Sequence, residues 1–99
     1  MSNVIRHVTI HGGVQGVGYR AWVGRHAIAS RLEGWVRNRR DGSVEALFSG
    51  EANAVAEMVA SCRRGPASAR VHAVSDQPAD AESMKLRRPG ESFSVLGTV

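Results

Sequence analysis

Alternation of hydrophobic and polar residues predicts a β-strand near the start of the chain. Over residues 4–11, Val8 and Ile10 fall on one face, whereas Thr9 and His11 fall on the other. A period of two is typical of a strand that has one face buried and one face in solvent. We therefore expect this segment to cover part of the hydrophobic core.

A second alternating stretch predicts a β-hairpin. Residues 35–38 begin a strand, and the pair Asp41-Gly42 that follows is a strong short-range hairpin signal. The return segment 43–49 places its apolar residues on one face, namely Val44, Ala46 and Phe48. The two segments are thus predicted to pair as neighbouring antiparallel strands.

Two segments carry the helical period of 3.6 residues. Residues 21–32 place four apolar side chains broadly on one side, and residues 51–64 place four at the spacing i, i+3, i+4 and i+7. The stripe on the second helix predicts that Cys62 is a core thiol rather than a nucleophile. The two apolar sets are Trp22, Val23, Ala27 and Leu32, then Val55, Met58, Val59 and Cys62.

The remaining segments complete the order β-α-β-β-α-β. Residues 70–76 are predicted to form a short strand, the polar residues 77–92 a long loop, and residues 93–97 a fifth, edge strand. This order is typical of an α+β, ferredoxin-like fold, in which two helices pack on one face of a four- to five-stranded antiparallel sheet. We expect a single domain over residues 1–99, with its core in about 4–76.

Composition narrows the class of protein and its setting. The chain of 99 residues is 42% hydrophobic and 22% charged, as in an ordinary globular domain. The single cysteine permits neither an internal disulfide nor a cysteine-based zinc site, which fits a reducing, cytoplasmic setting. No signal peptide is visible, and no apolar run approaches the roughly 18 residues of a membrane span.

The charge balance favours an anionic partner. The formal net charge is +4, and Lys85 is the only lysine among the cationic residues. Such a balance suits a small phosphorylated substrate or a nucleic acid, and charge alone does not choose between them. No long exposed apolar stripe demands a protein partner, so we expect a monomer.

The glycine-rich segment 12–20 is the strongest candidate for chemistry. Glycine permits positive φ, so successive backbone N–H groups can turn toward one anion, and the following helical pattern adds a helix N-terminus. Arg20 ends the segment, and its planar guanidinium matches a phosphate or a carboxylate. No Lys-Ser/Thr pair follows the glycines, so the pattern is not a Walker motif. From glycine spacing alone, an ordinary turn with a surface arginine is an equally good interpretation.

Two motifs resemble those of a known family. Segment 12–20 has the sequence GGVQGVGYR and resembles the first signature of the acylphosphatase family, and segment 34–45 has the sequence GWVRNRRDGSVE and resembles the second. The likeness extends from about residue 7 to residue 74. The chain departs from the family pattern at Gly13, where a basic residue is usual, and at Ser30-Arg31, where Leu-Gly is common and a different helix ending is suggested.

The resemblance implies hydrolysis of the carboxyl–phosphate bond of a small-molecule acyl phosphate, without cofactor or metal. Inorganic phosphate and similar anions would act as product-like ligands, and neither a nucleic acid nor a membrane is implied as a partner. Asn38 would orient the attacking water through its side-chain amide. The phosphoryl oxygens would be bound by the Arg20 guanidinium and by backbone N–H groups of Gln15, Gly16, Val17, Gly18 and Tyr19.

Two other functions compete with this interpretation. RNA-recognition domains share the same element order, but they stack bases on exposed aromatic residues of central strands; here the first strand has none, and the third has only Phe48 on its apolar face. An accessory phosphate-binding domain is the second alternative. Without the family resemblance, Asn38 is better interpreted as a polar residue at a strand end.

Overall fold

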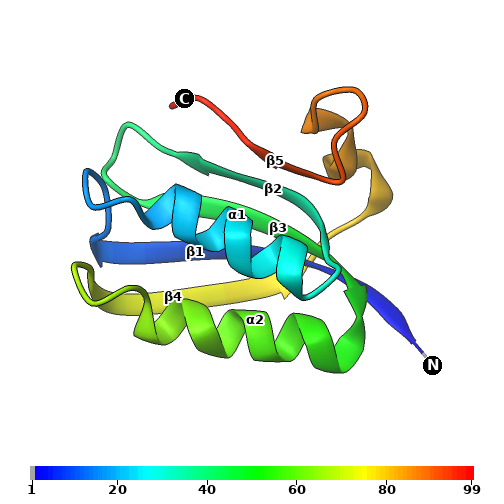
Figure 1. The fold of residues 1–99 in the computed structure, drawn as a ribbon, viewed down its shortest axis with the longest axis horizontal. Helices are drawn as coiled ribbons and strands as arrows, with labels where there is room; N and C mark the ends of the chain where they lie inside the picture. The colour runs from blue at the N-terminus through cyan, green and yellow to red at the C-terminus, as the bar shows by residue number, and fades with distance from the viewer. Residues whose placement is uncertain (1) are drawn as a thin grey trace.

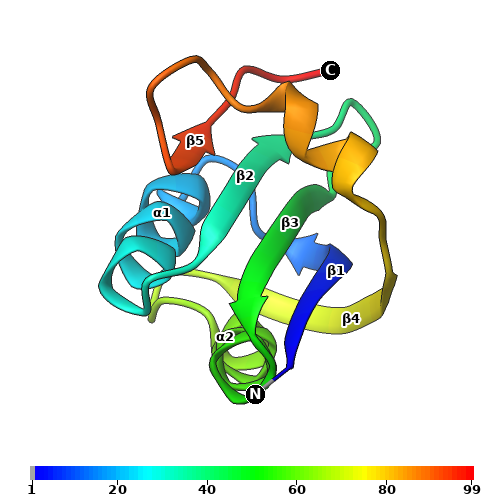
Figure 2. The ribbon, with the colours of Figure 1, turned by 90° about the vertical axis from the view of Figure 1, so that its right-hand side faces the viewer.

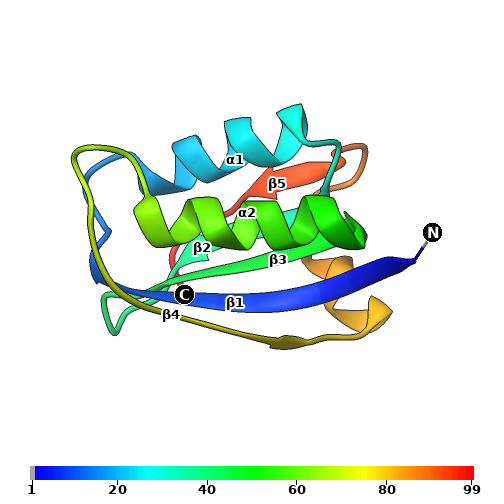
Figure 3. The same ribbon diagram turned by 90° about the horizontal axis from the view of Figure 1, so that it is seen from below.

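The computed structural model describes residues 2–99 and contains one mixed sheet with two helices on one of its faces (Figure 1, Figure 3). The strand order across the sheet is β4-β1-β3-β2-β5. The elements in chain order are β1 (Asn3–Gly13), α1 (Tyr19–Ala29), β2 (Glu33–Asn38), β3 (Val44–Glu51), α2 (Ala52–Arg64), β4 (Arg70–Pro78), the 3₁₀ helix η1 (Ala81–Leu86) and β5 (Phe93–Val95).

The predicted ferredoxin-like fold is confirmed, and its core lies between the helices and the sheet. Strand β1 pairs antiparallel with both β3 and β4, and β2 pairs antiparallel with β3. Val8 and Ile10 are fully buried on the face that the helices cover, as the alternation predicted. Within residues 2–99, no helix combines the length and hydrophobicity needed to span a membrane.

The segment after β4 differs from the expected long loop. Strand β4 continues to Pro78, and η1 then lies on the face of the sheet opposite the helices (Figure 2). Trp35 and Leu47 are nearly or fully buried, at 2% and 0% exposed, outside the helix-side core. The indole N–H of Trp35 donates to the carbonyl of Ser83 at 2.8 Å. Residues 77–92 appear loop-like in sequence because they cover the second sheet face with few apolar side chains.

The last strand also differs from expectation. Strand β5 covers only residues 93–95, and it pairs parallel with β2 rather than antiparallel. After β4 the chain passes through η1 across the second face of the sheet. It then forms the opposite edge strand, β5, which runs in the same direction as β2. Hydrogen bonds then continue along that edge from Leu96 N–H to the carbonyl of Val36 at 2.8 Å and from Val99 N–H to the carbonyl of Asn38 at 3.0 Å.

Helix α1 ends in an ordinary Schellman motif, although the sequence suggested a different ending. The N–H of Arg31 donates to the carbonyl of Ile28 at 3.0 Å, and the N–H of Leu32 donates to the carbonyl of Ala27 at 2.9 Å. This geometry requires a left-handed residue, and Arg31 supplies it with φ of 59°. Glycine is the usual residue there because it has no Cβ to crowd the following carbonyl.

We expect Arg31→Gly to stabilise the protein. Removing the left-handed strain outweighs the extra chain entropy of glycine, for a net gain of about 0.5–1 kcal/mol in the free energy of unfolding. For a domain of this size the gain raises the melting temperature by roughly 2–8 °C. Arg25→Gly is a matched control, because it removes the same charge from an exposed position inside α1 and should cost about 1 kcal/mol. Equal destabilisation by both variants would contradict the prediction.

A buried ionic cluster lies on the sheet face that η1 partly covers. Glu45 is only 6% exposed, and it lies on the face of β3 opposite Val44 and Ala46 of the helix-side core. Its carboxylate accepts hydrogen bonds from His7 Nε2 at 2.6 Å and from Arg37 Nε at 2.7 Å, and Arg39 Nη1 lies 3.4 Å away. Burial opposes ionisation of Glu45, but the hydrogen bonds and charges of His7 and Arg37 outweigh it and lower its pKa.

We expect Glu45→Gln to destabilise the fold at neutral pH by about 1–3 kcal/mol, because it leaves the partly buried cations without their counter-charge. Because the pKa of Glu45 is lowered in the native state, its ionised carboxylate stabilises the fold at pH values above the ordinary pKa of 4.5. This contribution disappears as the pH falls through the native pKa. The stabilities of wild type and variant should therefore converge in acid. Urea titrations from pH 7 to pH 3 measure this, with the exposed Glu82→Gln as control. A difference that does not depend on pH would contradict the assignment.

Candidate active site

The glycine-rich segment forms the turn between β1 and α1. Gly16 and Gly18 have φ of 77° and 79°, so both positions need the left-handed freedom of glycine. The helix begins at Tyr19, two residues earlier than predicted, and its first main-chain hydrogen bond runs from Trp22 N–H to the carbonyl of Gly18 at 3.0 Å. The N–H groups of Tyr19 and Arg20 precede it and have no acceptor within the helix. They are donors at the positive end of the helix dipole.

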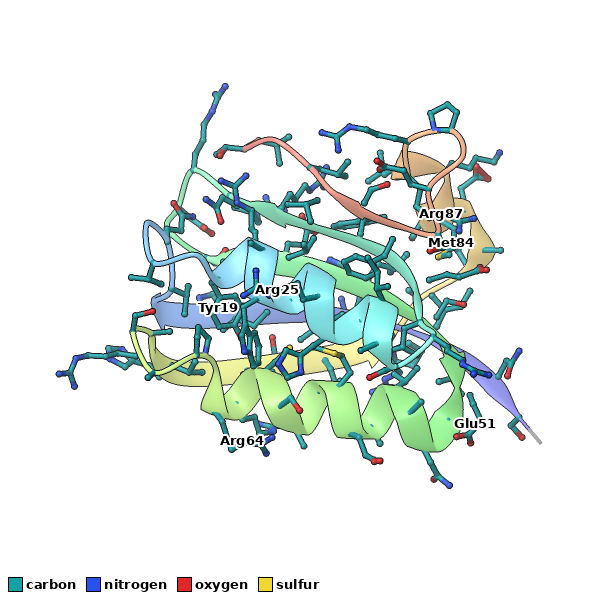
Figure 4. All side chains as sticks on the ribbon, in the orientation of Figure 1. Tyr19, Arg25, Glu51, Arg64, Met84 and Arg87 are labelled. Carbon is teal, nitrogen blue, oxygen red and sulfur yellow. The ribbon has the colours of Figure 1, made fainter. Side chains whose placement is uncertain are left out.

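The Tyr19 side chain anchors this turn to the body of the protein (Figure 4). Tyr19 is 1% exposed, and its hydroxyl donates to the carbonyl of Cys62 in α2 at 2.8 Å. Burial raises the pKa of the phenol, so it remains a neutral donor. Cys62 is fully buried, as predicted for a core thiol, and burial raises the pKa of its thiol to about 12. Only the backbone of Tyr19 is therefore available to an anion.

Arg20 lies in the first turn of α1, and its guanidinium is oriented by the C-terminal segment. Its Nη1 donates to the carbonyl of Leu96 at 2.9 Å. One hydrogen bond uses only a small part of the donor capacity of a guanidinium, which has five N–H groups. Within residues 2–99 this is the one hydrogen bond of the Arg20 guanidinium, so its remaining donors can bind a ligand.

Asn38 is the last residue of β2 and lies on the helix side of the sheet. It is 9% exposed and pairs with Val44 across the hairpin. Its backbone carbonyl accepts the hydrogen bond from Val99 described above, so the C-terminal segment holds the main chain of Asn38 as well as the side chain of Arg20. The sequence did not predict this double role of the C-terminal residues.

One cavity of about 400 Å³ brings these groups together. Arg20 and Asn38, which the sequence separates by one helix and a strand, both form part of its wall. Gly16, Gly18 and Tyr19 of the turn line it as well. The turn, the start of α1 and the end of β2 therefore meet at one site.

Gln15 and Val17 are not among the residues that line the cavity, although the family resemblance places them in the phosphate-binding segment. Gln15 Nε2 donates to the carbonyls of Arg39 and Ser43 at 2.7 and 2.8 Å. The carbonyl of Val17 accepts a hydrogen bond from Ser68 Oγ at 3.1 Å. Their contacts therefore hold the turn in place from outside the cavity.

Hydrogen bonds within the β2–β3 turn hold its conformation. The Asp41 carboxylate accepts hydrogen bonds from the N–H and the hydroxyl of Ser43, at 2.9 and 2.6 Å. These bonds lower the pKa of Asp41. Because Gln15 binds this turn, the glycine-rich segment and the end of β2 are held at a set separation.

We expect Gln15→Ala to lower kcat/KM for an acyl phosphate by about 10- to 100-fold, because small displacements of positioned groups are costly in rate. Two lost hydrogen bonds should reduce the free energy of unfolding by only about 1–2 kcal/mol. The measurement is steady-state hydrolysis together with thermal unfolding. Gln77→Ala, at an exposed position in β4, is the control and should leave both unchanged. Full activity of Gln15→Ala would contradict a positioning role.

The cavity also includes residues that the sequence did not single out. Arg88, Val95 and Leu96 come from the segment that was predicted as loop and edge strand. No local pattern marks them, because they reach the cavity only through the parallel return of β5 beside β2.

Comparison with known proteins decides the family. A model of the acylphosphatase family matches residues 6–94. The chain belongs to the acylphosphatase family. Acylphosphatases from Bradyrhizobium diazoefficiens (strain JCM 10833 / USDA 110) and Rhodopseudomonas palustris (strain BisB18) are 65% and 62% identical to it over 99 residues, with 100% of each chain covered. A solved acylphosphatase structure from Coxiella burnetii has a TM-score of 0.83 at 30% identity and covers 95% of this chain and 93% of that one.

These comparisons confirm the family predicted from the two acylphosphatase signatures in segments 12–20 and 34–45. They also confirm that the chain is an enzyme of the acylphosphatase type with a ferredoxin-like fold. The likeness spans nearly the whole chain, including the segment after residue 76 that sequence motifs did not cover.

Proposed function

We propose that the enzyme hydrolyses acyl phosphates by holding the phosphoryl group at the start of α1 and directing a water molecule to it from Asn38. The observation that carries this proposal is the common cavity, in which Arg20, the glycine turn and Asn38 meet. The Arg20 guanidinium and the N–H groups of the cavity-lining residues of the turn and of the start of α1 supply positive potential for three phosphoryl oxygens. Those oxygens carry charge in the transition state of phosphoryl transfer.

In the proposed reaction, the water oxygen forms a bond to phosphorus while the bond from phosphorus to the carboxyl oxygen breaks. The electron pair of that bond leaves with the carboxylate. The leaving group is a weak base, so it needs no general acid. One proton of the water passes to a phosphate oxygen of the substrate, and the products are a carboxylate and inorganic phosphate. The side-chain amide of Asn38 orients the water during attack.

We further propose that the protein acts as a monomer in a reducing, cytoplasmic setting. The presence of a single cysteine, Cys62, is the basis for the reducing setting, since a chain with one cysteine cannot form an internal disulfide. Inorganic phosphate is expected to bind the same cavity as a product and to inhibit in competition with substrate.

The experiment that tests the function is hydrolysis of benzoyl phosphate, followed by the release of benzoate and inorganic phosphate. We expect enzyme-dependent turnover that a chelator does not change, because Arg20 and the backbone donors supply the positive field. If the protein shows no turnover but phosphate raises its melting temperature in an Arg20-dependent way, the cavity is a binding site only, and the accessory-domain alternative replaces the proposal.

A further inference from the structure

A second cation lies in the wall of the cavity, and the proposed chemistry does not use it. Arg88 lines the cavity with Arg20, and its side chain is 53% exposed. Among the described residues that line the cavity, these two carry positive charge and none carries negative charge. Arg20 already lies beside the N–H groups that would bind the phosphoryl oxygens. Arg88 therefore adds positive charge on the part of the wall that the C-terminal segment forms.

Arg88 is held in position despite its exposure. Its backbone N–H donates to Ser94 Oγ at 2.9 Å, and Ser94 is fully buried. Its Nη1 donates to the carbonyl of Val95 at 2.8 Å. Both bonds attach Arg88 to β5, so its guanidinium is pre-organised for a ligand at this wall.

The charge of Arg88 is only partly compensated within the protein. The nearest carboxylate oxygen, from Glu91, lies 3.8 Å from Nη1, which is longer than a charge-assisted hydrogen bond. That same oxygen accepts the hydroxyl of Ser94 at 2.7 Å. Of its five N–H groups, the Arg88 guanidinium uses one in a hydrogen bond to the described part of the chain, so most can bind an anion.

An apolar surface lies in the same wall. Val95 is 37% exposed, and with Ala21 and Leu96 it lines the cavity. An acyl phosphate bound with its phosphoryl group at Arg20 would place its acyl part against these side chains. A cation beside an apolar surface selects a ligand that has an apolar body and an anionic end.

We propose that Arg88 is a specificity-determining residue that binds an anionic group on the acyl part of the substrate. The preferred class is then acyl phosphates whose acyl group carries a second anion, such as a carboxylate. This inference rests on the proposed function, since it concerns the part of the same cavity that would bind the acyl group.

The test compares benzoyl phosphate with 3- and 4-carboxybenzoyl phosphate, in which the second anion lies at two different distances from the phosphoryl group. The selectivity is the ratio of kcat/KM for a carboxybenzoyl phosphate to kcat/KM for benzoyl phosphate. The ratio cancels general losses of activity or stability. We expect Arg88→Gln to lower it by about 10-fold or more for at least one isomer, since a hydrogen-bonded charge contact is worth that much. Arg88→Lys should retain part of it, because the charge remains.

Arg25→Gln is the control for net charge, because Arg25 is exposed on α1 (Figure 4) and is not among the residues that line the cavity. We expect it to leave the ratio unchanged. An unchanged ratio in Arg88→Gln, or equal losses for all three substrates, would overturn the assignment and leave the proposed function intact. An equal fall in Arg25→Gln would also overturn it. If the wild type hydrolyses none of the three, the proposed function itself fails.

Discussion

Arg20→Ala is expected to reduce kcat/KM for benzoyl phosphate by on the order of 10³-fold or more. An arginine that stabilises transferring phosphoryl charge typically contributes that much. Most of the loss should appear in kcat, because the charge on the phosphoryl oxygens changes between substrate and transition state. The measurement is steady-state kinetics, with thermal unfolding to show that the fold is retained.

Arg20→Lys separates charge from geometry. Lysine keeps the positive charge but cannot present two parallel N–H groups to one phosphoryl group, so we expect an activity between those of wild type and Arg20→Ala. Arg25→Ala removes the same charge from an exposed position on the same helix and should remain within about twofold of wild type. If Arg20→Ala loses no more activity than Arg25→Ala, then Arg20 does not bind the phosphoryl group.

Asn38→Ala is expected to reduce kcat for benzoyl phosphate by roughly 10²- to 10³-fold, as for loss of a positioned side-chain donor in a transition state. KM should change much less, because the proposal gives Asn38 a contact with water rather than with the substrate. Inhibition by inorganic phosphate should likewise be retained. These two readouts distinguish loss of the oriented water from collapse of the phosphate site.

Asn38→Asp is a near-isosteric companion variant. It keeps the shape of the side chain but replaces the amide donor with a carboxylate, which would repel the phosphoryl group. We expect it to lose both activity and phosphate inhibition. A variant Asn38→Ala with wild-type kcat would show that the water is oriented by another group.

The sequence pattern predicted the hairpin and α2 well, because each is specified by residues that lie close together in the sequence. The hairpin followed from Asp41-Gly42 between two alternating segments, and α2 followed from its apolar stripe. The start of α1 was placed two residues late, since glycine-rich sequence lowers helix propensity while Gly18 in fact serves as the N-cap. The Schellman ending of α1 was not predicted, because Arg31 occupies the position where glycine is usual. The hydrogen bonds of this motif require positive φ there whichever residue is present.

Part of the candidate site was likewise predicted from the sequence, and part of it was not. Family motifs pointed to Arg20 and Asn38, and the structure brings both to one cavity. Spacing alone did not reveal that Gln15 binds the β2–β3 turn instead of lining the cavity. Arg88 and Leu96 could not be predicted, because their approach to Arg20 depends on η1 crossing the second sheet face and on the parallel pairing of β5 with β2.

The most direct test of the account is hydrolysis of benzoyl phosphate by the wild-type enzyme in water enriched in ¹⁸O. Mass spectrometry then determines which product contains the heavy oxygen. Attack on a phosphoryl group held at Arg20 predicts one ¹⁸O atom in inorganic phosphate and none in benzoate. Label in benzoate would mean that water attacks the carbonyl carbon, and it would contradict the roles proposed here for the glycine turn, Arg20 and Asn38.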